Sequence, residues 1–323
     1  MRTLRYLHAV KEAVQQEMRR DQDIIIIGED VRQSLRGITK GLVDEFGSDR
    51  VIDTPISELA LVGCATGLAM SGVRPIVEFQ LPEFVFFAFE QIVNQAQKLR
   101  YMTGGKLTIP VTYIVPGLGA CGAGLAGQHS DTTYTYVLHG GVKVAIPSTP
   151  YDAKGLLITA IRDNDPVMVY LPAKCLGIKG EVPEELYTLP FGEGVIRKDG
   201  KDLTIIATGH LVNVAVEVAK EVEGKGISIE VLDLRTLLPI DKDLIKKSIS
   251  KTGRVIIIDD SNKTCGVAAE ISAIIGEEVF THLKAPIRRI SRADVPVPFS
   301  LPMECYVMPD KEKLINIINE FNF

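Results

Sequence analysis

The chain has 323 residues, of which 46% are hydrophobic and 24% charged, and 36 basic against 41 acidic side chains give a net charge of −5. This composition excludes a disordered chain, and the acidic balance argues against broad electrostatic binding to nucleic acid or acidic membranes. At about 150 residues per domain, the length indicates two domains.

The first half of the chain alternates apolar runs of strand length with segments of helical period. The sequence predicts strands at 23–27, 74–80, 108–115, 142–146 and 167–171, and helices at 3–19, 59–70, 83–100 and 151–162. The strands are apolar on both faces, which is typical of a parallel sheet covered by helices. We therefore predict an α/β domain over residues 1–185.

Residues 186–200 interrupt this rhythm with Pro190 and three glycines, and we interpret them as a linker. A second α/β domain is predicted over residues 201–323. Its expected strands are 203–207, 227–232, 254–259 and 287–290, and its expected helices are 212–223, 241–249, 268–279 and 311–319.

The uncharged segment 107–130 is long enough to span a bilayer. Pro110, Pro116 and five glycines would break a lipid-exposed helix there, so we predict a buried strand that runs into a glycine-rich loop, and no membrane association. Residues Gly117 to Gly122 fit the pattern G-x-G-x-x-G. A dinucleotide site also needs a following helix and a later acidic residue, which the sequence lacks, so NAD binding is not expected.

The chain has five cysteines, and no two of them have the spacing of metal ligands. Their odd number and wide separation favour reduced thiols in a cytoplasmic protein. We expect them to serve as small buried side chains.

Two side chains are candidates for chemistry. Ser57 can cap a helix that places Glu58 in its first turn, where the helix dipole favours a carboxylate. Five phenylalanines within residues 79–89 could form an aromatic wall for a flat heterocycle beside this carboxylate, although such a cluster more often belongs to a hydrophobic core. His129 follows the glycine-rich loop and could move protons near neutral pH, or it could be a solvated histidine.

Several motifs are spread over nearly the whole chain. They are GEDV at 28–31, RVIDTPISE at 50–58, the aromatic run at 84–94, QHS at 128–130, IPSTPYDAKG at 146–155, DLRTLLP at 233–239, GVAAE at 266–270 and VPVPF at 295–299. Together they resemble the beta subunit of the thiamine diphosphate-dependent first component of 2-oxo acid dehydrogenases. That family includes pyruvate, branched-chain 2-oxo acid and acetoin dehydrogenases.

The resemblance implies an N-terminal parallel-sheet domain that binds the pyrimidine of thiamine diphosphate and a C-terminal transketolase-like α/β domain. It implies that Glu58 faces the aminopyrimidine ring, that Ile56 and Phe84 contact this ring, and that Gln80 lies near it. His129 would act beside the reaction centre as a proton donor when the acyl group passes to a lipoyl carrier.

The resemblance also implies what other chains supply. The sequence lacks the Gly-Asp-Gly motif through which thiamine diphosphate enzymes bind magnesium and the diphosphate. An alpha subunit would hold both, in a heterotetramer of two alpha and two beta chains that serves a lipoyl acyltransferase core and a small 2-oxo acid substrate. In some relatives the turn 160–165 helps to hold a monovalent cation, which leaves potassium as an open alternative here.

The chain departs from the family pattern at two of these positions. Asp165 stands in that turn where asparagine is expected, and Phe84 stands where many members carry tyrosine. Three other functions stay open at this point: an acetoin dehydrogenase beta subunit, a half-transketolase that transfers ketol groups between sugars, and a non-catalytic α/β subunit. The last predicts that Glu58→Gln leaves function intact.

Overall fold

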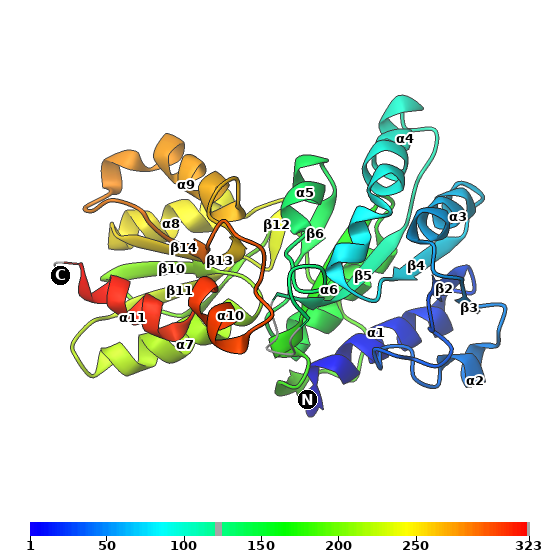
Figure 1. The fold of residues 1–323 in the computed structure, drawn as a ribbon, viewed down its shortest axis with the longest axis horizontal. Helices are drawn as coiled ribbons and strands as arrows, with labels where there is room; N and C mark the ends of the chain where they lie inside the picture. Colours follow the sequence, from blue (N-terminus) through cyan, green and yellow to red (C-terminus); the bar gives the residue numbers. More distant parts are fainter. Residues whose placement is uncertain (120–124, 322–323) are drawn as a thin grey trace.

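The computed structural model describes residues 1–119 and 125–321, which form two α/β units side by side (Figure 1). The N-terminal unit is built on a seven-stranded sheet with the strand order β12-β6-β7-β5-β4-β2-β3. Its strands are β2 (Ile24–Gly28), β3 (Val51–Asp53), β4 (Arg74–Glu78), β5 (Thr112–Leu118), β6 (Lys143–Ala145), β7 (Val167–Pro172) and β12 (Thr236–Leu238).

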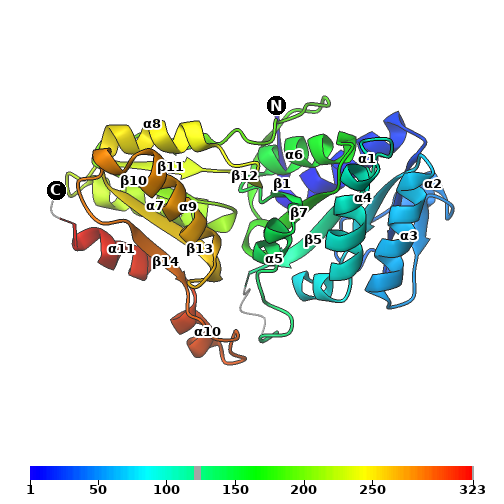
Figure 2. The same cartoon turned by 90° about the horizontal axis from the view of Figure 1, so that it is seen from above.

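All neighbours in this sheet are parallel except β12 and β6. The central strands are buried along their length because helices cover both faces, as the apolar runs predicted. One face packs on α1 (Tyr6–Arg20), α2 (Leu42–Phe46) and α6 (Pro150–Arg162). The other packs on α3 (Glu58–Met70), η1 (Pro82–Phe86), η2 (Glu90–Ala96), α4 (Gln97–Met102) and α5 (Tyr134–His139) (Figure 2).

The C-terminal unit has a five-stranded sheet in the order β14-β13-β10-β11-β9. Its strands are β9 (Val195–Lys198), β10 (Leu203–Ala207), β11 (Ile229–Asp233), β13 (Val255–Asn262) and β14 (Arg288–Arg292). The helices α7 (His210–Glu223) and α11 (Lys311–Asn319) cover one face, and α8 (Lys242–Thr252) and α9 (Val267–Glu278) cover the other. The latter helices share one hydrophobic cluster with the N-terminal unit, so the two cores are continuous.

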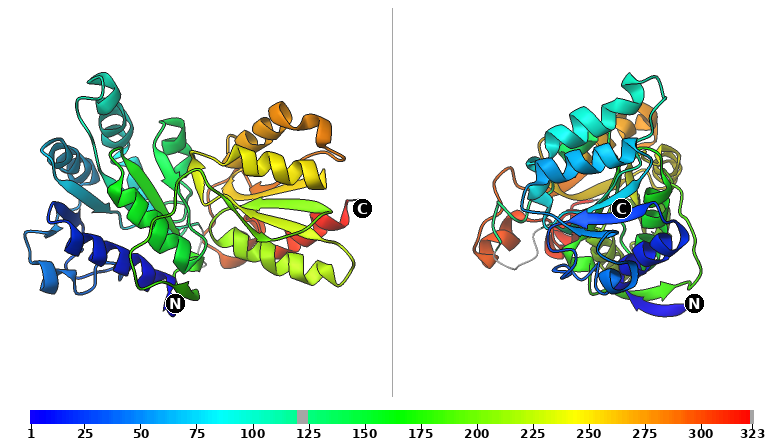
Figure 3. Two further views of the ribbon diagram at one scale, coloured as in Figure 1. Left: turned by 180° about the vertical axis from the view of Figure 1, so that it is seen from behind. Right: turned by 90° about the vertical axis from the view of Figure 1, so that its right-hand side faces the viewer.

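The remaining elements are short. They are β1 (Arg2–Arg5), β8 (Lys179–Val182), η3 (Ala173–Cys175), η4 (Phe280–His282) and α10 (Leu301–Val307). The strands β1 and β8 form an antiparallel pair beside α1 and α6, which lie against each other (Figure 3). The helix predicted at 3–19 therefore begins at Tyr6, because the preceding residues pair as a strand.

The predicted linker needs a correction at its C-terminal end. Residues Val195–Lys198 form β9, which pairs antiparallel with β11 and belongs to the C-terminal sheet. The glycines beside it are required by packing, since a Cβ on Gly200 would lie 2.1 Å from the carbonyl carbon of Ile229. The glycine content that indicated a flexible segment thus marks close backbone approach.

The helix predicted at 83–100 is also wrong as a single helix. The structure has a 3₁₀ turn (η1), a π-helical segment (η2) and a short α-helix (α4) in this region. Its aromatic side chains do not share one face, since Phe87 is exposed while Phe84 and Phe89 are partly buried against the core. A π segment has no reliable pattern in sequence.

Cysteine burial was predicted incorrectly for most of the thiols. Of the four cysteines in the described ranges, Cys175 is buried, whereas Cys64, Cys265 and Cys305 are exposed, and all four are free thiols. Cys121 and Gly122, the last residues of the glycine-rich pattern, lie outside the described residues. None of the helices in the described part of the chain has the length and apolar character that crossing a membrane requires.

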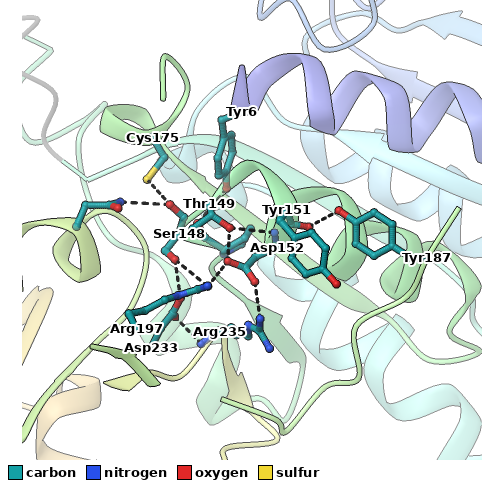
Figure 4. Close-up of polar contacts among 12 residues, drawn as sticks. Tyr6, Ser148, Thr149, Tyr151, Asp152, Cys175, Tyr187, Arg197, Asp233 and Arg235 are labelled. Atoms are coloured by element: carbon teal, nitrogen blue, oxygen red, sulfur yellow. Dashed lines mark hydrogen bonds and ion pairs between the residues drawn. The ribbon is translucent and has the colours of Figure 1, made fainter. Parts of the chain in front are cut away.

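The two units are joined by a cluster of buried ion pairs, which we name the interdomain cluster (Figure 4). Asp152, in the first turn of α6, pairs with Arg197 of β9 and lies 2.8 Å from the guanidinium of Arg235. Asp233, at the end of β11, accepts from Arg197 at 2.7 Å and from the hydroxyl of Ser148 at 2.5 Å. Asp152 of the N-terminal unit therefore faces guanidinium groups from the C-terminal side, and Ser148 binds Asp233 across the same boundary, which fixes the two units relative to each other.

Candidate active site

Three glutamates gather at the carboxyl edge of the seven-stranded sheet. Glu29 follows β2, Glu58 begins α3 shortly after β3, and Glu78 ends β4. These three strands are neighbours, and all three side chains are buried. Ligands of open parallel sheets bind outside the carboxyl ends of the strands, so these three residues, which we name the glutamate edge, mark a candidate site.

Glu58 lies in the first turn of α3, as the sequence predicted, but the capping prediction is wrong. The side chain of Ser57 makes no cap hydrogen bond. The backbone N–H of Ser57 instead acts electrostatically on the carboxylate of Glu29 and opposes the rise of its pKa. The start of α3 therefore lies beside the loop after β2, with the carboxylates of Glu29 and Glu58 near each other.

The glutamate edge carries little compensating charge. Burial raises the pKa of Glu78 to about 8, against the opposing effect of the Arg36 guanidinium. Burial also raises the pKa of Glu29, and the negative charge of Glu58 adds to this rise. One carboxylate oxygen of Glu29 and one of Glu78 are buried without a hydrogen-bond partner. Carboxyl groups held in this way are characteristic of functional sites.

Gln80 connects this edge to its surroundings. Its amide nitrogen donates to the backbone carbonyl of Glu29, and its amide oxygen accepts from Nε of Arg36 at 3.1 Å. Both ends of the amide are therefore used within the chain. The structure places Gln80 beside Glu29, where it fixes the loop that carries this glutamate.

A pocket of about 400 Å³ lies between η1 and the segment that follows the glycine-rich loop. The rings of Phe84 and His129 meet edge to face there, with 5.7 Å between their centroids. The pocket is lined by Glu83, Phe84, Phe86, Phe87, Gly127, Gln128 and His129. The structure thus brings together two of the predicted site residues on one aromatic wall.

A chain of polar contacts holds the segment that carries His129. Glu83 accepts a hydrogen bond from the backbone N–H of Asp131, and burial raises the pKa of Glu83 to about 7 against that hydrogen bond. Asp131 in turn pairs at 2.5 Å with Arg292, and Arg292 also donates a hydrogen bond to the side-chain oxygen of Asn262. Arg292 is only 4% exposed and belongs to β14, so the C-terminal unit positions the loop of His129.

Ile56 stands apart from the other predicted site residues. Its side chain is 84% exposed. It lies two residues before the buried Glu58, so an apolar surface adjoins the glutamate edge and is left uncovered by this chain. The roles of Ile56, Glu58, Gln80, Phe84 and His129 toward a cofactor stay predictions at this point.

The exposed surface beside the site is apolar over several elements. After Glu58, α3 contains no charged residue, and its exposed side includes Leu59, Met70 and the open backbone at Gly67. Phe87 adds a side chain that is 65% exposed. A helix that is apolar all round is normally buried, so this face is suited to contact another protein chain.

Five residues of this region were not predicted from the sequence. These are Glu29, Glu78, Glu83, Asp131 and Arg292. Glu29 stands within the GEDV motif and Asp131 directly follows QHS, so both had a signal nearby. Burial distinguishes the other three, and burial cannot be read from a single sequence.

Comparison with known proteins first defines the class. Residues 2–177 match the family model described as "Transketolase, pyrimidine binding domain", and residues 192–314 match "Transketolase, C-terminal domain". A solved structure titled "Split gene transketolase, inactive beta4 tetramer" superposes with a TM-score of 0.79 over 98% of this chain and 97% of that one, at 21% identity. The chain is therefore a two-domain protein of the transketolase type, and the predicted α/β fold is confirmed.

Curated relatives then define the family. The chain is 42% identical to the acetoin:2,6-dichlorophenolindophenol oxidoreductase subunit beta of Bacillus subtilis, over 97% of this chain and 95% of that protein. It is 41% identical to the pyruvate dehydrogenase E1 component subunit beta of Staphylococcus aureus (99% and 99%) and 39% identical to the 2-oxoisovalerate dehydrogenase subunit beta of B. subtilis (97% and 97%). The chain belongs to the family of beta subunits of thiamine diphosphate-dependent 2-oxo acid dehydrogenases, and the predicted resemblance is confirmed.

Proposed function

We propose that this chain is the beta subunit of a 2-oxo acid dehydrogenase first component. With an alpha subunit, it decarboxylates a 2-oxo acid on thiamine diphosphate and transfers the acyl group to a lipoyl carrier. The glutamate edge carries this proposal, because it offers buried carboxylate oxygens without partners in a chain that is 39–42% identical to such subunits. The identity to the split-gene transketolase is only 21%, which favours dehydrogenase over ketol-transfer chemistry.

The residues of the site fit the pyrimidine half of thiamine diphosphate. The buried carboxylate of Glu58 can accept a hydrogen bond from a ring nitrogen, and Ile56 and Phe84 can cover an aromatic ring. Glu29 offers a further acceptor oxygen that has no partner within the chain. When bound, thiamine diphosphate supplies a carbon nucleophile and an electron sink.

Glu58 would hold the pyrimidine in the protonation state that the reaction requires. In an apolar site, a hydrogen bond between a carboxylate and a bound base is electrostatically stronger than in water, and a proton can pass between the two groups. Its place in the first turn of α3 fixes the direction of the carboxylate, since the N–H groups of that turn favour negative charge.

His129 would donate a proton from its imidazole to a sulfur of the lipoyl carrier as the acyl group is transferred. It lines the pocket beside Phe84, and Asp131 and Glu83 hold the adjoining backbone. A general acid must be held within hydrogen-bond reach of the atom that takes the proton. The contacts from Arg292 to Asp131 provide this support from the C-terminal unit.

We place the diphosphate and magnesium with an alpha subunit, because the Gly-Asp-Gly motif is lacking from this sequence. The apolar face of α3 and the exposed side chains of Ile56 and Phe87 provide a surface for that subunit. We further propose a heterotetramer of two alpha and two beta chains in the cytoplasm, which serves a lipoyl acyltransferase core.

Calorimetry on the chain alone and on its mixture with a candidate alpha subunit tests this proposal. We expect thiamine diphosphate with magnesium to bind only in the mixture, and Glu58→Gln to weaken this binding. The reconstituted protein is then assayed with pyruvate, branched-chain 2-oxo acids and acetoin, with lipoamide or a dye as acceptor. Tight binding by the isolated chain would contradict the split site, and turnover only with an aldose acceptor would establish the half-transketolase.

A further inference from the structure

The turn 160–165 joins α6 to β7 and contains two carboxylates that share one ammonium group. Nζ of Lys143 lies 2.9 and 2.8 Å from the two oxygens of Asp163 and 2.9 Å from Oδ2 of Asp165. Lys143 begins β6, the strand that pairs with β7. The ammonium therefore reaches the turn from the neighbouring strand and contacts three carboxylate oxygens.

Further oxygen atoms of this turn are also engaged by donors of the chain. Oδ1 of Asp165 pairs with the guanidinium of Arg100, at the end of α4. Arg74, which begins β4, donates to the backbone carbonyls of Ile161 at 2.8 Å and Asp163 at 2.5 Å. Two arginines thus support the turn in addition to the lysine.

Two further backbone carbonyls of the turn accept from N–H groups. The carbonyl of Ala160 accepts from the backbone of Asp163 at 3.1 Å, and the carbonyl of Asn164 accepts from Ile109 at 3.0 Å. A protein holds an alkali cation by replacing its hydration shell with several oxygen atoms. Four backbone carbonyls and both carboxylates of this turn are thus engaged by nitrogen donors, and these oxygens do not fit potassium.

Electrostatics points in the same direction. The carboxylates of Asp163 and Asp165 raise the pKa of Lys143 although burial lowers it, so the group is charged at neutral pH. Burial tends to raise the pKa of Asp165, but Lys143 and Arg100 outweigh it and bring this pKa below its usual value. A metal cation here would meet a fixed positive charge on the same carboxylates.

We propose that the ammonium group of Lys143 takes the place of a monovalent cation in this turn, so that the chain neither binds potassium there nor depends on it. Asp165, the residue that departs from the family pattern, is the second carboxylate of this pair. The ammonium group of Lys143 links β6 to the turn before β7. Asp165 then links this turn, through Arg100, to the end of α4. This inference concerns the fold of the chain and does not rest on the proposed reaction.

Thermal unfolding of the full chain in potassium, sodium or choline chloride at equal ionic strength tests this inference. We expect one midpoint in all three salts. In Lys143→Ala the midpoint should fall by several degrees in choline chloride and recover in part in potassium chloride, because the two carboxylates then lack their cation. Lys247→Ala removes an exposed lysine and should match the parent chain in each salt.

The parent chain alone can overturn the proposal, which keeps the test decisive even where Lys143→Ala does not fold. A midpoint of the parent that rises in potassium chloride and not in choline chloride would show a potassium site. A folded Lys143→Ala chain with equal midpoints in all three salts would show that the lysine does not replace a cation.

Discussion

Two of the regions near the seven-stranded sheet that contain buried carboxylates differ in their surroundings. In the interdomain cluster, Asp152 and Asp233 face two guanidinium groups and a hydroxyl. At the glutamate edge, Glu29 and Glu78 each keep a buried oxygen without a partner. Buried carboxylates paired with guanidinium groups can hold two units in register, whereas buried carboxyl groups with an unpartnered oxygen raise the free energy of the free protein and can gain partners when a ligand binds.

The largest expected effect comes from Glu58→Gln. Removing the acidic group should lower turnover by the complex with the alpha subunit about 10³-fold, because proton exchange with the bound ring is lost. The midpoint of thermal unfolding should not fall, since a neutral amide relieves the repulsion with Glu29. The measurement is steady-state turnover in parallel with calorimetry of unfolding.

Glu312→Gln provides the control for this substitution, because Glu312 is exposed in the first turn of α11. Turnover by that variant should equal the turnover of the parent. A Glu58→Gln complex with parental turnover would establish the non-catalytic alternative.

The next effect concerns the interdomain cluster. Arg197→Leu leaves the carboxylates of Asp152 and Asp233 buried with one guanidinium fewer, and we expect it to lower the free energy of unfolding by about 3–5 kcal/mol. Lys198→Leu, one residue further along β9, loses only a pair with the exposed Glu223 and should cost less than about 1 kcal/mol. Urea unfolding measures both. Equal losses would mean that burial does not distinguish the two pairs.

His129→Asn should lower the rate of acyl transfer to lipoamide about 10²-fold, because the general acid beside Phe84 is removed. Turnover with a dye that takes electrons without a lipoyl sulfur should fall less. Comparison of the two acceptors in one preparation measures this difference, and His8→Asn, an exposed position on α1, is the matched control. An equal decrease with both acceptors would refute the proposed proton transfer to sulfur.

The last prediction concerns the dependence of stability on pH. The pKa of Glu78 is 4.5 in the unfolded chain and about 8 in the folded one, so the folded state binds more protons between these values. The stability contributed by protonated Glu78 is complete below pH 4.5 and is lost as pH rises toward 8, with a slope of at most about 1.4 kcal/mol per pH unit.

Glu78→Gln should remove this slope and leave the variant more stable than the parent at pH 8. The difference in unfolding free energy between the two chains, measured at pH 5.5, 7 and 8, isolates this group from others that titrate. A difference that stays constant over this range would show that the carboxyl group is ionised throughout.

Much of the fold could be predicted from sequence because its strands and helices carry strong local patterns. The strand Leu203–Ala207 and the helix Lys311–Asn319 occur with the predicted limits. The strands β9 and β12 were missed because each is short and gains its pairing from residues distant in the chain. Local patterns do not contain the partner of a strand.

The site divides in a similar way. Glu58, Phe84 and His129 stand in motifs that resemble a family, and they could be named without coordinates. Glu78 and Arg292 have ordinary sequence surroundings, and only the folded chain shows that one is a buried acid and the other a buried base. In the turn 160–165, Asp165 already put potassium binding in doubt. That Lys143 neutralises the carboxylates of this turn could not be predicted, because this contact depends on the pairing of β6 with β7.

Strand β12 has a consequence for how this protein can be divided or recombined. Residues 236–238 lie beyond the predicted linker, yet they form the last strand of the N-terminal sheet, against β6. A fragment cut within residues 186–200 would leave β6 as a bare edge, which is a template for aggregation. Chimeras between related subunits should therefore exchange residues 236–239 together with the N-terminal unit and keep residues 195–233 with the C-terminal unit, because β12 follows the C-terminal strands in sequence but pairs with the N-terminal sheet.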